Sequence, residues 1–308
     1  MKKWKQKAVV QKAISYLPFK HGINFLFQKF VTKGVRLSDE YFTDRLTHAF
    51  DHISAFEEFS AVSLDSTLEL GTGWYPVVPL CLFLHGTGKI VTVDISGLLT
   101  AKNLQTTLNK FIEYRKTGKL SLYFKNGLGD EMKWRMVEEL ATNRILSLEQ
   151  MLAKLNINYK VADARHLDQP SHSFSLITSN NTFEHVYENV LREILAEFRR
   201  LAARGGVMSH FVDMSDHFAH FDKSITIYNF LQFSREKWDR IDNSIQPQNR
   251  LRITDYRKIY SALGIAISKE ICRPGSEKEL SGVRVDKMFS SISPKDLAVS
   301  HCLLISKM

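Results

Sequence analysis

A glycine-rich turn and an acidic strand end are the first residues in this chain that could do chemistry. Gly71, Thr72 and Gly73 follow a short apolar run, and Asp94 ends the next one. Glycine is needed where backbone N–H groups approach a ligand closely, because a Cβ atom would occupy that space. A carboxylate at the end of the second strand of a βαβ unit can accept hydrogen bonds from both ribose hydroxyls. The pattern therefore predicts a site for a nucleoside-containing cofactor.

A second group of candidates follows two later apolar runs. His185 comes after the fourth predicted strand, and Asp213, Asp216, His217 and His220 come after the fifth. An imidazole beside a carboxylate can take a proton from a hydroxyl group. We expect His217 or His185 to be a general base, with Asp213 orienting or assisting it. A structural hydrogen-bonding role for each histidine is the alternative.

Metal binding is a weaker interpretation of the same segment. His210, Asp213, His217 and Asp222 could form a divalent metal site, but the sequence gives no ligand geometry for them, and we predict no metal. His48 and His52 lie four residues apart in a helical pattern. No glutamate or third ligand accompanies these two in a recognisable motif, so a solvated or capping role is expected.

Three further residues could bind the second substrate. Tyr228, Arg250 and Arg252 could hold an anionic or sugar acceptor by stacking and charge. The alternative is that the two arginines belong to a salt-bridged surface.

The elements that must position these residues alternate between strand and helix. Strands are predicted at 67–70, 89–93, 158–162, 174–179, 207–212, 265–272 and 298–306. Helices are predicted from Ser38 onward and at 77–84, 190–201 and 254–263, and the long 100–155 insertion accommodates three more at 101–116, 130–142 and 148–155. The alternation predicts an α/β fold with a doubly wound, seven-stranded, mostly parallel sheet that binds ligands at the carboxyl ends of its strands.

Four motifs in this order resemble the class I S-adenosylmethionine (SAM)-dependent methyltransferases. They are ELGTG at 69–73, Asp94, ADA at 162–164, and FSLITSNNTFEHV at 174–186 followed by a helix and GGV. Two positions depart from the family pattern. Pro76 stands where many members have a third glycine, and Ser175 stands where an aspartate often follows the phenylalanine.

The resemblance implies a Rossmann-like fold, SAM as cofactor, and a set of cofactor-binding residues. It places Gly71, Thr72 and Gly73 at the methionine part of SAM, with Glu69 helping to anchor the ammonium group. The same resemblance implies that Asp94 holds the ribose hydroxyls and that Ile95 and Asp163 contact the adenine. It also implies that Ala164 contributes a backbone amide and that Asn180 lines the methionine side.

The implied function is methyl transfer to a small-molecule or saccharide acceptor, with O-methylation favoured over N-methylation. The segments FDKSITIYNFLQFS at 221–234 and QNRLRITDY at 248–256, with the N-terminal arm, are less specifically similar to methyltransferases encoded with bacterial surface-glycan pathways. This similarity suggests a saccharide, nucleotide-sugar or lipid-linked acceptor. One alternative is a methyltransferase-fold scaffold without turnover. Another is an NAD-dependent oxidoreductase, but its G-x-G-x-x-G pattern is broken at Pro76.

The net charge of +9 is concentrated at one end of the 308 residues. Residues 1–38 carry nine lysines and arginines and no acid, so the remaining 33 of 42 basic residues balance 33 acids. This distribution argues against a nucleic-acid binder, which would carry its basic patch on the fold. We expect residues 1–60 to form a basic, amphipathic helical extension and residues 61–308 the methyltransferase domain.

The extension and the cysteines indicate the compartment. Residues 1–38 could lie on an anionic membrane surface, although packing of their aromatic face on the protein is favoured. Cys81, Cys272 and Cys302 lie in or beside apolar runs and are expected to be reduced, buried thiols. These features predict a cytoplasmic protein, with a peripheral location at the inner face of the membrane as the alternative.

Overall fold

The computed structural model describes residues 2–17, 36–124 and 129–308. The chain packs as two compact units, each assembled from separate segments. The first unit combines Met1–Arg36, Asn181–Arg192 and Phe211–Leu304, and the second combines Leu37–Asn180, Glu193–His210 and Ile305–Met308. The predicted division near residue 60 stays a prediction. No described helix is both long and apolar enough to cross a lipid bilayer.

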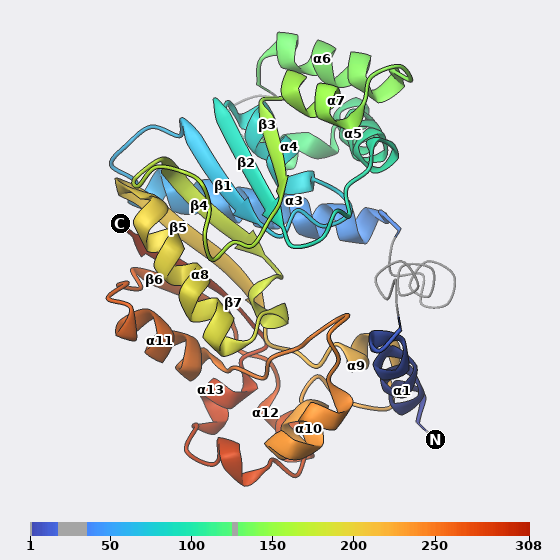
Figure 1. Cartoon of the computed structure of the whole chain (residues 1–308), viewed down its shortest axis with the longest axis vertical. Coiled ribbons are helices and arrows are strands. Elements are labelled where there is room, and N and C mark those ends of the chain that lie inside the picture. Colours follow the sequence, from blue (N-terminus) through green and yellow to red (C-terminus); the bar gives the residue numbers. More distant parts are fainter. Residues whose placement is uncertain (1, 18–35, 125–128) are drawn as a thin grey trace. The chain divides into compact units, whose positions relative to one another are not determined.

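The strands form a seven-stranded sheet in the order β3-β2-β1-β4-β5-β7-β6 (Figure 1). They are β1 (Ser66–Leu70), β2 (Lys89–Asp94), β3 (Ile157–Val161), β4 (Phe174–Asn180), β5 (Ala202–Asp213), β6 (Lys269–Arg273) and β7 (His301–Lys307). Strand β1 pairs in parallel with β2 and β4, and β2 pairs in parallel with β3. This confirms the predicted α/β fold with a seven-stranded, mostly parallel sheet.

Strand β7 runs antiparallel to β5. Near the start of β5, Gly205 donates from its backbone N–H to the carbonyl of Met308 at 2.7 Å, and near the other end Met214 donates to Ser300 at 2.7 Å. The chain winds outward from β1 to β3 in one direction and from β4 to β5 in the other. The strand order therefore reverses between β1 and β4, which is where open α/β sheets bind their ligands.

Helices cover both faces of the sheet in the second unit. His52 of α3 (Asp39–Phe59) contacts Ser209 of β5, whereas Phe198 of α8 (Glu188–Leu201) stacks on His210. Consecutive residues of a strand point to opposite faces, so α3 and α8 lie on opposite sides of the sheet. Helix α4 (Val77–His85), which is apolar on all sides, packs against α3 and β2.

The histidines of α3 are buried, which corrects the expected solvated or capping role. His48 and His52 are 1% and 0% exposed, and the His52 Nδ1 atom lies 2.8 Å from the hydroxyl of Ser209. Burial lowers the pKa of His52 to about 3, so its ring stays neutral. The helical spacing was correct, but it could not show that this face meets the sheet.

The predicted helical insertion is present. It contains α5 (Ala101–Lys116), α6 (Glu131–Thr142) and α7 (Leu148–Lys154), with a short 3-10 turn, η2, at Lys119–Leu122. Ser147 and Gln150 form the capping box expected at the start of α7. Figure 1 shows the three helices gathered near the β3 edge of the sheet, where α7 packs on β3 and α5 packs on α6.

The first unit has its own helices and its own core. They are α1 (Lys3–Ser15), η3 (Phe183–His185), α9 (Phe218–Phe221), η4 (Asn229–Gln232), α10 (Arg235–Ile241), α11 (Ile253–Ala262), α12 (Glu277–Ser281), η5 (Lys287–Phe289) and α13 (Pro294–Ala298). Trp4 of α1 is buried in an aromatic cluster with Phe218, Phe233 and Trp238. Packing of the arm's aromatic face on the protein is thus observed for α1. The second amphipathic stretch, around Phe25 and Phe30, lies outside the described residues.

Several predicted boundaries were wrong for local reasons. Helix α8 ends at Leu201 as predicted, but β5 begins at Ala202 and not at residue 207, so Gly205 and Gly206 lie within the strand. A Cβ on Gly206 would come within 2.6 Å of the Ser175 carbonyl oxygen. Helix α11 is capped two residues earlier than expected, at Arg252, because the Asp255 carboxylate accepts from the N–H of Arg252. Strand β6 is shorter than predicted.

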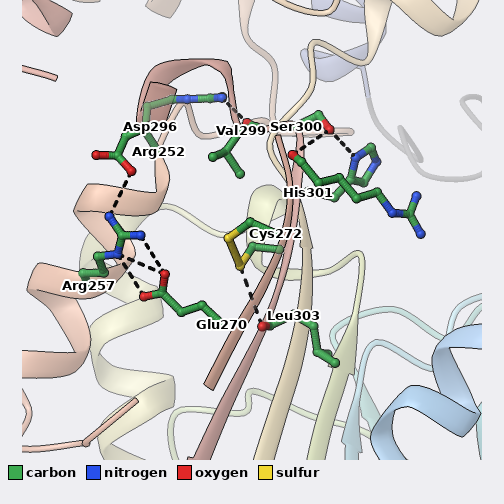
Figure 2. The surroundings of a disulfide bond; sticks show 11 residues. Arg252, Arg257, Glu270, Cys272, Asp296, Val299, Ser300, His301 and Leu303 are labelled. Atoms are coloured by element: carbon green, nitrogen blue, oxygen red, sulfur yellow. Dashed lines mark hydrogen bonds and ion pairs between the residues drawn. A yellow bond between two sulfur atoms is a disulfide. The ribbon is translucent and has the colours of Figure 1, made fainter. Parts of the chain in front are cut away.

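A disulfide joins the two strands at one edge of the sheet (Figure 2). Cys272 of β6 pairs with Cys302 of β7, and Cys81 remains a buried free thiol. The expectation of three reduced cysteines was therefore wrong. Pairing could not be read from two cysteines 30 residues apart, because it depends on β6 and β7 becoming neighbours in the sheet.

Candidate functional site

The glycine-rich turn follows β1 in the second unit. Gly71 and Gly73 have φ angles of 90° and 64°, a region that glycine occupies without steric cost. The N–H of Gly71 donates to the carbonyl of Val93 at 2.8 Å, which ties the turn to β2. A Cβ built on Gly73 would meet no atom within 4 Å, so open space lies beside this part of the backbone. The turn therefore fits close approach by a ligand.

Asp94 lies at the end of β2, next to that turn. Its carboxylate accepts hydrogen bonds from the N–H groups of Gly73 and Ser96, each at 3.0 Å. Burial raises the pKa of Asp94, while these backbone hydrogen bonds oppose the shift. Ile95 follows with 73% of its surface exposed, as expected of an apolar residue available to a flat ring. This end of β2 fits a ribose and an adenine.

Glu69 is buried beneath the turn. It is 3% exposed, and its carboxylate accepts a hydrogen bond of 2.6 Å from the hydroxyl of Thr92, which also contacts Thr72. Burial raises the pKa of Glu69 to about 8. A buried carboxyl group of this kind is stabilised in its charged form by a nearby cation, so it fits the ammonium group of SAM.

The remaining cofactor candidates are placed unequally. Asn180 ends β4, one residue beyond the Leu70–Ser179 pair of the β1–β4 register, so it lies near the turn. Asp163 is held by Arg165, whose guanidinium approaches its carboxylate to 2.6 Å and lowers the pKa of Asp163. Ala164 is buried. If Asp163 binds the adenine, its carboxylate must accept hydrogen bonds from both the adenine amino group and Arg165.

Asp213, at the end of β5 in the first unit, is surrounded by imidazoles. Its carboxylate oxygens lie 3.3 Å from Nε2 of His217, 3.4 Å from Nε2 of His301 and 3.8 Å from Nε2 of His220. Burial alone would raise the pKa of Asp213, but the neighbouring His217, His220 and His301 hold it well below its usual range. These neighbours therefore favour the ionised form of Asp213 at neutral pH.

His185, of η3, completes the predicted catalytic group. The His185 and His217 rings lie 4.9 Å apart in an edge-to-face arrangement. The Nδ1 atom of His185 lies 2.7 Å from the Pro247 carbonyl oxygen, which accepts hydrogen bonds and cannot donate them. Nδ1 therefore carries the proton, and a neutral His185 has its lone pair on Nε2. The three predicted catalytic residues thus lie together in the first unit.

Two sets of side chains within this cluster could hold a metal ion. Glu184, His185 and His217 form one set, and Asp213, His217 and His220 form the other, each with ligand atoms within 4.8 Å of one another. The set considered from the sequence is not assembled. His210 lies in the second unit beside Ser179, and Asp222 accepts hydrogen bonds from Trp4 and Ser224.

The predicted acceptor-binding residues are buried in the first unit. Tyr228 donates from its hydroxyl to the Ala298 carbonyl, and Arg250 donates to the carbonyls of Phe230 and Phe233. Arg252 is 0% exposed and donates to the carbonyls of Met214, Leu297 and Val299. These contacts organise the backbone of the first unit, and acceptor binding by the three residues stays a prediction.

Comparison with known proteins finds a family model that matches part of the chain. Residues 117–206 match the family model described as a methyltransferase domain. The match covers 90 of the 308 residues, so it shows that this part of the chain is similar to methyltransferase domains. This match and the strand order confirm the predicted resemblance to the class I SAM-dependent methyltransferases. The matched residues begin after the glycine-rich turn and Asp94, so the roles of those residues rest on the geometry above. No curated protein matches the chain.

Solved structures with similar folds are distant in sequence. A putative methyltransferase from Bacillus halodurans C-125 is 14% identical, with 83% of this chain and 98% of that one covered and a TM-score of 0.43. A putative sarcosine dimethylglycine methyltransferase from Galdieria sulphuraria is 14% identical (85% and 84% covered, TM-score 0.44), and a SAM-dependent methyltransferase from Mesorhizobium loti is 12% identical (85% and 100%, 0.44). These TM-scores are below 0.5, so no functional argument rests on them.

We call the group of Glu184, His185, Asp213, His217, His220 and His301 the histidine cluster. Sequence reasoning missed two of its residues, Glu184 and His301. Glu184 lies within the FEHV segment, and its carboxylate lies within 4.8 Å of the ligand atoms of His185 and His217. His301 starts the last strand, and its approach to Asp213 depends on β7 folding back beside β5. No local sequence signal identifies His301, because the predicted strand at 298–306 does not show which strand it pairs with.

Proposed function

We propose that this protein is a SAM-dependent methyltransferase that acts on a hydroxyl group of a small-molecule or saccharide acceptor. The observation that carries the proposal is the group formed by Asp213, His217 and His185, which occurs in a chain with the methyltransferase sheet. The glycine-rich turn and Asp94 support SAM as the cofactor. There is open space beside Gly73, the Asp94 carboxylate lies next to the turn, and the exposed side chain of Ile95 is available to pack against an adenine ring.

The cofactor would be held by the second unit. Gly71 and Gly73 would receive the methionine part, Asp94 the ribose and Ile95 the adenine, with Glu69 near the ammonium group. SAM supplies an electrophilic methyl group on a sulfonium, so the protein's tasks are to align the acceptor and exclude water.

The first unit would prepare the acceptor. A hydroxyl must lose its proton as it attacks, whereas an amine needs only to be neutral. Asp213 stays ionised and lies 3.3 Å from Nε2 of His217, an arrangement that favours a proton on Nε2 and leaves Nδ1 to accept one. His185 presents Nε2 as a second proton acceptor. Two proton acceptors fit O-methylation better than N-methylation.

A saccharide is the acceptor class that we favour. The support is the similarity of the FDKSITIYNFLQFS and QNRLRITDY segments to glycan-pathway methyltransferases. Tyr228, Arg250 and Arg252 lie in these segments, and their burial favours shaping an acceptor site through the backbone over direct contact. Peripheral membrane association through residues 1–38 is part of the proposal.

Transfer of a labelled methyl group tests this function. Purified protein is incubated with methyl-labelled SAM and a panel of hydroxyl and amine acceptors, saccharides included, and product is quantified. Asp213→Asn should lower kcat by about a hundredfold while leaving SAM affinity unchanged, because it removes the charge that orients His217. Asp239→Asn, an exposed aspartate in the same unit, is the control and should retain the wild-type rate.

Three results of this assay would change the interpretation. SAM binding without label transfer to any acceptor would favour the scaffold alternative. Labelling of amines alone, with no effect of Asp213→Asn, would contradict O-methylation. If a chelator abolished turnover and a divalent ion restored it, Asp213, His217 and their neighbouring histidines would hold a metal ion, and His217 would not be the base.

A further inference from the structure

Helix α1 has two stripes with different surroundings. One stripe, formed by Trp4, Ala8, Gln11 and Ile14, is buried. A second stripe, formed by Lys5, Val9, Ala13 and Tyr16, recurs at the same helical spacing but lies on the outside of the unit. Val9 is 61% exposed and Tyr16 is 77% exposed. A helix that is already anchored by one face therefore presents a second apolar stripe to solvent.

Residues around α10 form the opposite wall of an open groove. Phe233, Lys237, Arg240 and Ile241 face the second stripe of α1, and together with it they line a space of about 640 Å³. We refer to this space as the α1–α10 groove. All of its lining residues belong to the first unit. Its floor is apolar, since Trp4, Ala8 and Phe233 lie there with Ile241.

The charged residues that line the groove are all basic. They are Lys5, Lys12, Lys237 and Arg240, and no acidic side chain is among the described lining residues. The ammonium group of Lys12 is fixed at one side, because it donates to the carbonyl of Asp239 at 3.0 Å and to that of Asp242 at 2.6 Å. An apolar floor with a cationic rim complements a hydrocarbon chain attached to an anionic group.

We propose that the α1–α10 groove is the docking surface for a lipid bilayer that contains anionic phospholipids. Apolar side chains of the same helix region also lie exposed outside the groove, since Val10 is 40% and Leu17 is 48% exposed. Lys2 and Lys3 are exposed at its start. A single soluble amphiphile would cover the groove alone, whereas a bilayer surface also accommodates these neighbouring apolar and basic side chains.

This inference deepens the membrane association named in the proposed function, and it does not depend on methyl transfer. It also extends the sequence prediction of a basic membrane-binding arm. The prediction concerned residues 1–38, whereas four of the eleven residues that line the groove come from residues 233–241, which the fold of the first unit brings beside α1.

Vesicle flotation of the full-length protein tests the proposal. Vesicles of phosphatidylcholine alone are compared with vesicles of equal parts phosphatidylcholine and phosphatidylglycerol. The wild-type protein should float with the anionic vesicles and lose most of that binding as salt is raised. Lys237→Glu with Arg240→Glu, and separately Val9→Ser with Tyr16→Ser, should each lower the partition coefficient by at least about tenfold.

Matched controls separate a specific surface from general charge. Lys102→Glu with Lys116→Glu makes the same change of charge on exposed positions of α5 and should leave binding unchanged. Circular dichroism and SAM affinity of each variant show that it is folded.

Four results would overturn the proposal. The first is equal binding to neutral and anionic vesicles, and the second is no binding to either. The third is a loss of binding in the α5 control as large as that in the groove variants. The fourth is a concentration-dependent dimer in sedimentation that Val9→Ser with Tyr16→Ser dissociates, because a second copy would then be the occupant of the groove.

Discussion

At the scale of single residues, two carboxyl groups of this chain have pKa values shifted in opposite directions. Asp213 is kept charged by His217, His220 and His301, whereas Glu69 is kept protonated by burial. The first suits a group that orients a base. The second suits a group that awaits a cationic ligand. Both residues were identified from the sequence, but their charge states follow from their surroundings in the fold.

Glu69 makes the stability of the protein dependent on pH. In the unfolded chain its pKa is 4.5, and in the folded protein it is about 8. Between these values the folded state holds one more proton, so the free energy of unfolding falls as pH rises from 4.5 towards 8. Glu69→Gln keeps the hydrogen bond from Thr92 without titrating. The variant should therefore lose less stability than the wild type, by about 3 kcal/mol over two pH units within this range.

Urea unfolding of both proteins at a pH below 6 and a pH above 8, about two units apart or more, measures this difference. Glu40→Gln, an exposed acid of α3, is the control and should follow the wild-type pH dependence. An identical pH dependence in Glu69→Gln and the wild type would show that Glu69 is ionised in the folded protein, and the ammonium argument would lose its basis.

At the scale of elements, Arg252 shows why side-chain type does not reveal role. Its guanidinium is fully buried and donates to the carbonyls of Met214, Leu297 and Val299, which joins the end of β5 to the α13–β7 connection. Arg252→Leu would leave these carbonyls without their donor and should lower the free energy of unfolding by about 3 kcal/mol or more.

Urea unfolding checks this expectation, and Arg284→Leu, at an exposed position, is the control and should change stability little. If Arg252→Leu instead kept wild-type stability and raised KM for the acceptor, the acceptor-binding role predicted from the sequence would be correct and the structural one wrong.

The Cys272–Cys302 disulfide belongs to the same scale, because it joins β6 to β7 (Figure 2). It closes a loop whose ends are 30 residues apart. Closing a loop of this length restricts the unfolded chain, so Cys272→Ser with Cys302→Ser should lower stability by about 3 kcal/mol. Cys81→Ser is the control variant for the loss of a thiol.

Alkylation of the denatured, unreduced protein followed by mass spectrometry tests the pairing directly. One cysteine, Cys81, should be modified before reduction and all three after it. Three modified cysteines without reduction would contradict the disulfide.

The fold could be predicted from the sequence further than the site could. The strand ends at Leu70, Asp94 and Asn180 are local features, and apolar runs with glycine turns locate them within a few residues. The approach of His301 to Asp213, the burial of His52 and the α1–α10 groove depend on segments distant in sequence. Local pattern carries no information about such contacts until the sheet order is known.

At the scale of the whole molecule, the candidate cofactor residues and the candidate catalytic residues fall in different compact units. The turn at Gly71–Gly73, Asp94 and Asp163 belong to the second unit, and His185, Asp213 and His217 belong to the first. The proposed function therefore separates into two claims, one for each unit. Variants in the first unit should impair transfer without impairing cofactor binding, and variants at Asp94 should impair both.

Titration of SAM into the purified protein by calorimetry tests the central claim most directly. The wild-type protein should bind SAM at a single site, and Asp94→Ala should weaken binding at least about tenfold, because the ribose hydroxyls lose their shared acceptor. Asp168→Ala, an exposed aspartate in the same unit, should leave the affinity unchanged. Absence of SAM binding to the wild-type protein, or equal affinities for wild type and Asp94→Ala, would contradict the account.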